Sequence, residues 1–213
     1  MEKECVVLIH GFARSSYSMS KINKRLQKHG YVTIPIDYPS RKYTIEQITE
    51  KFVIPKIKNE ITKYSKVHFV GYSLGGIITR YFLSINRPAN LGKVVFIATP
   101  NKGVEIVTHL GKYQWFKSIF GYAVNQLAEN SEFLSSLPQE VDYEAAVISG
   151  NFSTNPITSL FIIPGEDDGT VSVESTKING MKDHVIYSKT HMLLLHYEKV
   201  AESAEHFIAH GKF

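Results

Sequence analysis

Along the chain, short apolar runs alternate with stretches that carry apolar residues at three- and four-residue steps. A short continuous apolar run is typical of a strand buried on both faces, and the wider spacing is typical of an amphipathic helix. The run 159–163 fits either a further short strand or an extended loop. We expect strands at residues 5–9, 31–36, 66–70, 93–98, 144–149 and 184–187.

The helical stretches lie between these runs. Met19, Ile22 and Leu26 form the apolar face of a helix ahead of the second strand. A long helix is expected over residues 45–64, and Pro55 should kink it or split it, because proline has no N–H and clashes with the preceding turn. Further helical faces are formed by Leu74, Ile77, Ile78, Tyr81, Phe82 and Ile85, and in a closing helix by Leu193, Val200, Ala204, Phe207 and Ile208.

The alternation predicts an α/β fold, with about six mainly parallel strands covered by helices on both faces. In such sheets ligands bind beyond the carboxyl ends of the strands. His10, Ser73 and Thr99 each follow the end of a predicted strand. We therefore expect these residues to meet at one edge of the sheet.

The turn between the third strand and the next helix contains a G-x-S-x-G motif at residues 71–75. In this turn, called a nucleophile elbow, the serine takes a strained backbone conformation that lifts its hydroxyl above the sheet, and small neighbours leave room for the turn. A Gly-rich turn with no chemistry is the alternative interpretation. The strand before Ser73 and the helix after it favour the elbow.

A serine hydroxyl needs a base to take its proton, and the base needs a group to orient it. Downstream, an acidic turn contains Glu166, Asp167 and Asp168, and His191 follows the last predicted strand. The order Ser73, acid, histidine is the order in which this kind of fold supplies a catalytic triad.

Other histidines and the single cysteine are expected to have structural roles. His184 begins a strand and His196 lies within the closing helix, so neither occupies the loop that carries His191. His68 lies inside the third strand, where a buried side chain with satisfied hydrogen bonds is expected. Cys5 lies in an apolar run and is expected to be a buried, unreactive thiol.

Taken together, these motifs resemble the small α/β-hydrolases of the lipase and esterase type, and in particular compact bacterial lipases that open directly on a His-Gly strand. The His-Gly-Phe run at 10–12, the motif at 71–75, the acidic turn and His191 carry the resemblance. The phrases at 165–173 and 99–103 also look like those of lipase-like hydrolases acting on lipid or acyl esters.

The resemblance implies a compact α/β-hydrolase fold in which Ser73 is the nucleophile and His191 the general base. It implies Asp168 as the orienting acid rather than Asp167, with Glu166 a third alternative, because family members usually place the acid three residues before a valine. The unused acids are then expected to be solvated turn residues or helix caps.

The resemblance also implies an oxyanion hole made by the backbone N–H groups of Phe12 and Leu74. His10 is expected to brace the loop that carries Phe12 through hydrogen bonds. The residues expected to support the site are His10, Gly11, Gly71 and Gly75.

The activity implied is hydrolysis of carboxylic esters through an acyl-enzyme, as in a lipase or lipid-acyl esterase. An acyltransferase or thioesterase could use the same triad, and a non-catalytic binding protein on the same fold is a remoter alternative. No cofactor is expected, and no metal, because no His, Cys or carboxylate cluster has ligand spacing.

We expect a single domain over residues 1–213, with one segment, 101–142, outside the alternation of strands and helices. Its short helical pieces are either core-packing helices or a small cap whose aromatic side chains line an acyl-chain groove beside Ser73. The apolar residues concerned are Val104, Ile106, Val107, Leu110, Trp115, Phe116, Ile119 and Phe120.

Composition narrows the partners. The net charge of +4 is mild and the lysines are scattered, which argues against nucleic-acid binding and leaves weak attraction to anionic lipid surfaces open. The chain opens Met-Glu-Lys-Glu without a leader pattern, and no apolar run reaches the roughly 18 residues of a membrane span. These features predict a cytoplasmic protein, and the resemblance implies a small-molecule or lipid ester as its substrate.

Overall fold

The structure, a computed structural model, describes residues 3–154, 159 and 162–213. Within these residues, six strands form one parallel sheet in the order β2-β1-β3-β4-β5-β6, which confirms the predicted α/β fold. Residues 160 and 161, in the run that fits either a strand or a loop, lie outside the described residues. The strands are β1 Cys5–Ile9, β2 Val32–Ile36, β3 Val67–Tyr72, β4 Leu91–Ile97, β5 Ala145–Gly150 and β6 Asp183–Tyr187.

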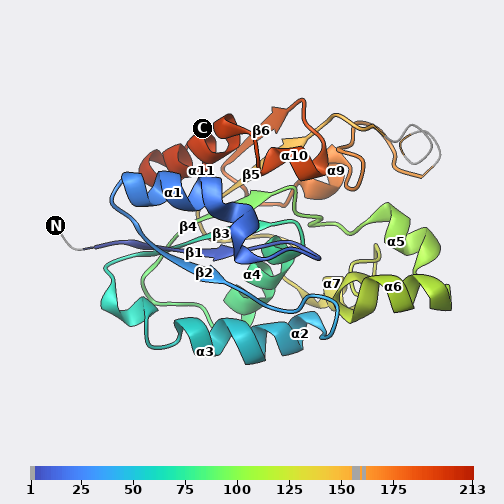
Figure 1. The fold of residues 1–213 in the computed structure, drawn as a ribbon, viewed down its shortest axis with the longest axis horizontal. Helices are drawn as coiled ribbons and strands as arrows, with labels where there is room; N and C mark the ends of the chain where they lie inside the picture. Colours follow the sequence, from blue (N-terminus) through green and yellow to red (C-terminus); the bar gives the residue numbers. More distant parts are fainter. Residues whose placement is uncertain (1–2, 155–158, 160–161) are drawn as a thin grey trace.

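Helices cover both faces of this sheet (Figure 1). The α-helices are α1 Ser20–Lys28, α2 Ile45–Ile48, α3 Ile54–Ile57, α4 Leu74–Ile85, α5 Glu105–Leu110, α6 Gln114–Asn125, α7 Glu132–Ser136, α9 Val173–Thr176, α10 His191–Leu194 and α11 Glu198–His210. In Figure 1, α1 and α11 lie side by side on one face, and α2, α3 and α4 lie on the other. None of the helices in the described part of the chain is both long and apolar enough to cross a bilayer.

Strand β1 shows why the strands consist of consecutive apolar residues in the sequence. All five of its residues are buried. Cys5, Val7 and Ile9 pack into the core on the side of α2, α3 and α4, and Val6 and Leu8 pack into the core on the side of α1 and α11. Because both faces of the sheet are covered by helices, every position in the strand must be apolar.

The helix interrupted by Pro55 continues through the proline instead of splitting at it. A π-helical turn, Thr49–Val53, joins α2 to α3, and the N–H of Ile54 donates to the carbonyl of Thr49. Pro55 then lies in the first turn of α3, and the wider π-helical turn directly before it accommodates the residue without an N–H. Beyond α3, a short 3₁₀ turn at Ile61–Lys63 replaces the expected end of the long helix.

The closing helix is shorter than the sequence pattern predicts. It begins at Glu198, and the half-exposed Leu193 belongs to the separate short helix α10. His196 lies in the turn between the two helices, so its predicted place within the closing helix is wrong. The N–H groups of His196 and Tyr197 donate to carbonyls three residues earlier, which closes this turn.

Candidate active site

Ser73 lies in the sharp turn between β3 and α4 with φ 52° and ψ −122°. A positive φ is unfavourable for a residue with a side chain, so the turn is strained at this position. The Ser73 N–H donates to the carbonyl of Ile97 at the end of β4, which holds the turn against the sheet. The predicted strand–turn–helix context of the elbow is thus present.

The two glycines of the motif leave room for this turn. A Cβ atom on Gly71 would lie 2.5 Å from the Cα of Gly76, and one on Gly75 would lie 2.1 Å from the carbonyl oxygen of Ile9. Neither space admits a side chain, because both obstacles are backbone atoms. Helix α4 can therefore start directly over the end of β1.

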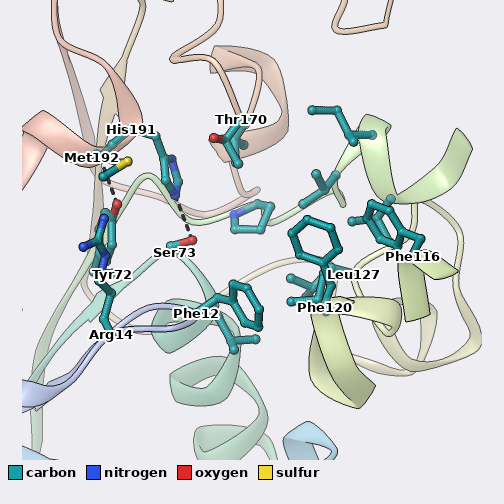
Figure 2. Close-up of a pocket in the computed structure, with 17 residues that line it drawn as sticks. Phe12, Arg14, Tyr72, Ser73, Phe116, Phe120, Leu127, Thr170, His191 and Met192 are labelled. Carbon is teal, nitrogen blue, oxygen red and sulfur yellow. Dashed lines mark hydrogen bonds between the residues drawn. The ribbon is translucent and has the colours of Figure 1, made fainter. Parts of the chain in front are cut away.

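His191 joins Ser73 to Asp168 in a chain of hydrogen bonds (Figure 2). Its Nε2 lies 3.0 Å from Ser73 Oγ, and its Nδ1 lies 2.7 Å from Asp168 Oδ2. Since the carboxylate only accepts, Nδ1 carries the hydrogen and Nε2 is left to accept the serine proton. The structure brings together the three residues predicted to form the triad.

Asp168 is held by its own turn as well as by His191. It is 2% exposed, and its second oxygen, Oδ1, accepts from the N–H groups of Thr170 at 3.0 Å and Val171 at 2.9 Å. The Asp168 carbonyl also accepts the N–H of His191 at 2.8 Å. These bonds fix the carboxylate toward the imidazole and leave it no freedom to turn into solvent.

The other two acids of the turn point elsewhere. Asp167 accepts the N–H of Gly169 at 2.7 Å and the hydroxyl of Ser159 at 3.0 Å, so it shapes the turn. It is only 5% exposed, and the expectation that it is solvated is wrong. Glu166 is exposed and accepts from Asn151 at 3.3 Å. Neither carboxylate contacts His191.

The loop after β1 carries the first predicted oxyanion donor and is braced from two sides. His10 Nδ1 donates to the carbonyl of Gly11 at 2.8 Å, and the Tyr38 hydroxyl donates to the His10 carbonyl. The two rings stack with centroids 4.1 Å apart. Burial lowers the pKa of His10, which keeps the ring neutral. A Cβ on Gly11 would lie 2.8 Å from the Tyr72 ring, so this loop lies directly against the elbow.

Two backbone N–H groups remain available beside the serine. Within the described part of the chain, the N–H groups of Phe12 and Leu74 donate to no other protein group. Unpaired donors next to a nucleophile, one in the loop after β1 and one at the start of α4, can bind a developing oxyanion.

A cavity of about 330 Å³ opens beside Ser73, and Figure 2 shows its aromatic wall. The rings of Phe116 and Phe120 stack at 4.3 Å, and Phe12 packs against Phe120 at 5.8 Å. The apolar residues that line it are Phe12, Leu74, Pro100, Val104, Ile106, Val107, Phe116, Phe120, Val124, Leu127, Val171 and Met192.

The segment 101–142 contributes side chains both to the core and to the wall of this cavity. Phe133 and Leu134 of α7 pack into the core, while α5 and α6 supply Ile106, Val107, Phe116, Phe120 and Val124 to the cavity wall. Trp115 and Ile119, expected with the apolar set, are instead 54% and 53% exposed and do not line the cavity.

The remaining histidines and the cysteine lie away from the triad. His68 is 2% exposed; its Nδ1 accepts the N–H of Lys93 and its Nε2 donates to Glu4, which confirms the predicted buried and satisfied side chain. His184 is hydrogen-bonded to Ser149 at 2.7 Å. Burial raises the pKa of the Cys5 thiol to about 12, as expected for an unreactive thiol.

Two contributors to the site are not evident from the sequence. The Tyr72 hydroxyl donates to the carbonyl of His191 at 2.9 Å and holds the histidine loop over the elbow. Arg14 lines the cavity two residues after Phe12. Only the proximity of each residue to a motif could have pointed to it.

In the described residues, no three His, Cys, Asp or Glu side chains are grouped so as to hold a metal ion.

A family model described as the alpha/beta hydrolase fold matches residues 4–133, more than half of the chain. The chain belongs to the alpha/beta hydrolase family. This hydrolase is 26% identical over 226 residues to lysosomal thioesterase PPT2-B of Xenopus laevis, a match that covers 86% of this chain and 77% of that protein.

Solved structures of two bacterial members of the family share the fold. The mature lipase BlEst2 of Bacillus licheniformis superposes with a TM-score of 0.71 and 18% identity, covering 100% of this chain and 93% of that one. The esterase EaEST of Exiguobacterium antarcticum superposes with a TM-score of 0.66 and 17% identity, covering 98% and 93%. At these identities the likeness shows the fold alone.

Proposed function

We propose that this alpha/beta hydrolase cleaves carboxylic esters through an acyl-enzyme intermediate. The observation that carries the proposal is the hydrogen-bonded chain from Ser73 through His191 to Asp168 at the mouth of an apolar cavity. A buried carboxylate, an imidazole in the correct tautomer and a serine on a strained turn together make a nucleophile out of an otherwise weak hydroxyl.

In the proposed reaction, Ser73 Oγ attacks the ester carbonyl carbon and its proton passes to Nε2 of His191. The negative charge that develops on the carbonyl oxygen is stabilised by the N–H groups of Phe12 and Leu74. His191 then returns the proton to the departing alcohol oxygen as the ester bond breaks. Water then gives a proton to Nε2 of the same imidazole and attacks the acyl carbon. The acyl–Oγ bond breaks, the acid leaves, and the proton passes from His191 back to Ser73 Oγ. Asp168 accepts from Nδ1–H of His191 and stabilises the imidazolium each time it forms.

The shape of the cavity supports a lipophilic acyl group, as in a lipase or lipid-acyl esterase. Its wall beside Ser73 is built from apolar side chains of the segment 101–142, which we take to be a groove-lining insertion. An acyl chain bound there is removed from water at a gain of about 0.8 kcal/mol per buried methylene. Longer acyl chains should therefore raise kcat/KM until the groove is filled.

Thioester hydrolysis is a second candidate, favoured by the 26% identity to a protein named as a thioesterase. The same triad can attack a thioester carbonyl, and the acyl groove would serve both kinds of substrate.

The relative is named as lysosomal, and cytoplasmic placement of this chain stays a prediction.

Labelling with a fluorophosphonate tests the proposal directly. We expect one adduct, at Ser73, in the folded wild type and none in Ser73→Ala, whose circular dichroism should be unchanged. Rates on 4-nitrophenyl esters from acetyl to decanoyl test the acyl preference, and matched octanoyl oxoesters and thioesters rank the two candidates. Absence of labelling in folded protein would leave a non-catalytic binding protein, and a clear preference for acetyl over octanoyl would contradict the lipophilic acyl group.

A further inference from the structure

The cavity around Ser73 has two chemically different sides. In Figure 2, Phe12, Phe116, Phe120 and Leu127 lie on one side of the serine. The other side is formed by Arg14, Tyr72 and Met192 (Figure 2). The first side is apolar and aromatic, whereas the second brings a guanidinium to the mouth of the cavity.

The charge of Arg14 is not paired with a carboxylate in the part of the chain that the structure describes. Arg14 is exposed, and among the described residues its side chain forms no hydrogen bond or ion pair. Its guanidinium is always protonated in proteins and offers five N–H donors. Two nearby carboxylates are engaged elsewhere: Asp37 accepts the N–H and hydroxyl of Ser16, each at 2.7 Å, and Asp168 holds His191.

The loop that carries Arg14 is fixed in place. Ala13 has φ 52°, a conformation that side chains disfavour, and its N–H donates to Ser40 Oγ at 2.9 Å. Phe12, whose N–H is the proposed oxyanion donor, directly precedes this turn. The backbone therefore presents an oxyanion donor and a guanidinium within three residues.

Arg14 also lies on the side where the leaving group departs. Arg14 and Tyr72 line the same side of the cavity (Figure 2), and the Tyr72 hydroxyl donates to the carbonyl of His191. If the acyl chain fills the apolar side, the other substituent of the ester carbonyl must extend toward the opposite side. His191 lines that region and can protonate the departing oxygen or sulfur.

We propose that Arg14 forms a leaving-group subsite for an anion, so that the enzyme prefers esters or thioesters whose alcohol or thiol part carries a carboxylate or phosphate. This inference rests on the proposed function. The uncompensated guanidinium would pair with the anion in charge-assisted hydrogen bonds as the acyl chain enters the groove. The substrate class is then an apolar acyl group joined to an acidic, water-soluble part.

Matched esters separate the charge from the rest of the substrate. We suggest the butanoyl esters of 4-hydroxybenzoate, of methyl 4-hydroxybenzoate and of 4-hydroxyphenyl phosphate, which share an acyl group and differ in the charge of the leaving group. The readout is the ratio of kcat/KM for each anionic ester to that for the neutral ester. In Arg14→Gln this ratio should fall about fivefold, the upper range for a solvent-accessible ion pair, and Arg14→Lys should retain part of it.

Arg41→Gln is the matched control, because Arg41 is exposed, lies 5.5 Å from the Phe12 ring and does not line the cavity. It removes an equal charge from the same region and should leave the ratio unchanged. The wild-type ratio should also decrease as NaCl is raised, because salt screens an exposed charge. A fall for only one of the two anionic esters would identify carboxylate or phosphate as the group bound.

An unchanged ratio in Arg14→Gln, or an equal fall in Arg41→Gln, would overturn the subsite. Failure of the proposed function gives a different result: the neutral ester would be hydrolysed no faster by wild type than by Ser73→Ala. The two failures are therefore distinguishable in one set of assays.

Discussion

The backbone N–H of His191 donates to the backbone carbonyl of Asp168 at 2.8 Å, so the proposed base and acid are joined through their main chains as well as through their side chains. The loop after β6 and the turn before α9 therefore form one unit. Substitution of either side chain leaves this backbone link intact, which makes the chemistry of the side chains testable without loss of the fold.

For Asp168→Asn we expect kcat to fall by about 10³- to 10⁴-fold, since an amide in place of the carboxylate favours the wrong imidazole tautomer. Unfolding in urea should change little, because the new side-chain carbonyl can still accept from Thr170 and Val171. Asp167→Asn is the control: its side-chain carbonyl can still accept from Gly169 and Ser159, so stability should change little, and kcat should stay within about tenfold. If Asp167→Asn were the inactive variant, the assignment of the acid would be wrong.

The strain at Ser73 gives a prediction about stability. Glycine adopts positive φ without the side-chain clash, so Ser73→Gly should be more stable than Ser73→Ala by about 1 kcal/mol. Both variants should be inactive, and urea unfolding followed by tryptophan fluorescence provides the comparison. Equal stabilities would mean that the elbow stores no strain at this residue.

Glu105 is a buried carboxyl that the proposed mechanism does not use. It is 4% exposed, its Oε1 accepts the hydroxyl of Ser172 at 2.6 Å, and its Oε2 has no partner among the described residues. Burial raises the pKa of Glu105, since the charged form is poorly solvated. Ser172 forms an isolated antiparallel β-bridge with Asp167. Through its bond to Ser172, the Glu105 carboxyl therefore links the start of α5 to the acidic turn.

The sign of its effect on stability follows from this shift. The unfolded chain releases the Glu105 proton near pH 4.3, whereas the folded chain retains it to higher pH, so this group lowers the free energy of unfolding as pH rises above about 4. Glu105→Gln removes that loss. The stability of this variant relative to wild type should therefore increase between pH 4.5 and pH 8 in urea titrations, and a pH-independent difference would contradict the shift.

The groove assignment predicts a change in acyl preference. Ile106 lines the cavity, so Ile106→Phe should shorten the groove. The 4-nitrophenyl ester with the highest kcat/KM should then carry a shorter acyl chain. The ratio of kcat/KM for the decanoyl ester to that for the butanoyl ester should fall about tenfold. Ile119→Phe makes the same change on a residue that is 53% exposed and outside the cavity, and its chain-length profile should match wild type. Parallel shifts in both variants would place the acyl chain elsewhere.

Strand positions, the fold and the grouping of Ser73, Asp168 and His191 could be predicted because each depends on a local signal. Continuous apolar runs indicate buried parallel strands, and the elbow, acidic turn and histidine follow strand ends in a recognisable order. The separation of α10 from α11 had no such signal. Leu193 and Val200 are seven residues apart, close to two helical turns, so the periodic pattern continues across a turn that contains no helix.

Contacts between distant segments explain the rest of what the sequence did not predict. The bond from Tyr72 to the His191 carbonyl and the position of Arg14 opposite the aromatic wall depend on how three loops meet in space. A single tyrosine or arginine beside a motif has no periodicity to reveal this. The π-helical turn before Pro55 is likewise a response of the backbone to one residue, and the sequence predicted a disturbance there without its form.

The close approach of Gly75 to the Ile9 carbonyl has a consequence for how this enzyme could change over evolution. The start of α4 rests on main chain, so the nucleophile is aligned by atoms that every sequence shares. Side chains of α5 and α6 can therefore diverge, and substrate range with them, while the reacting serine keeps its place.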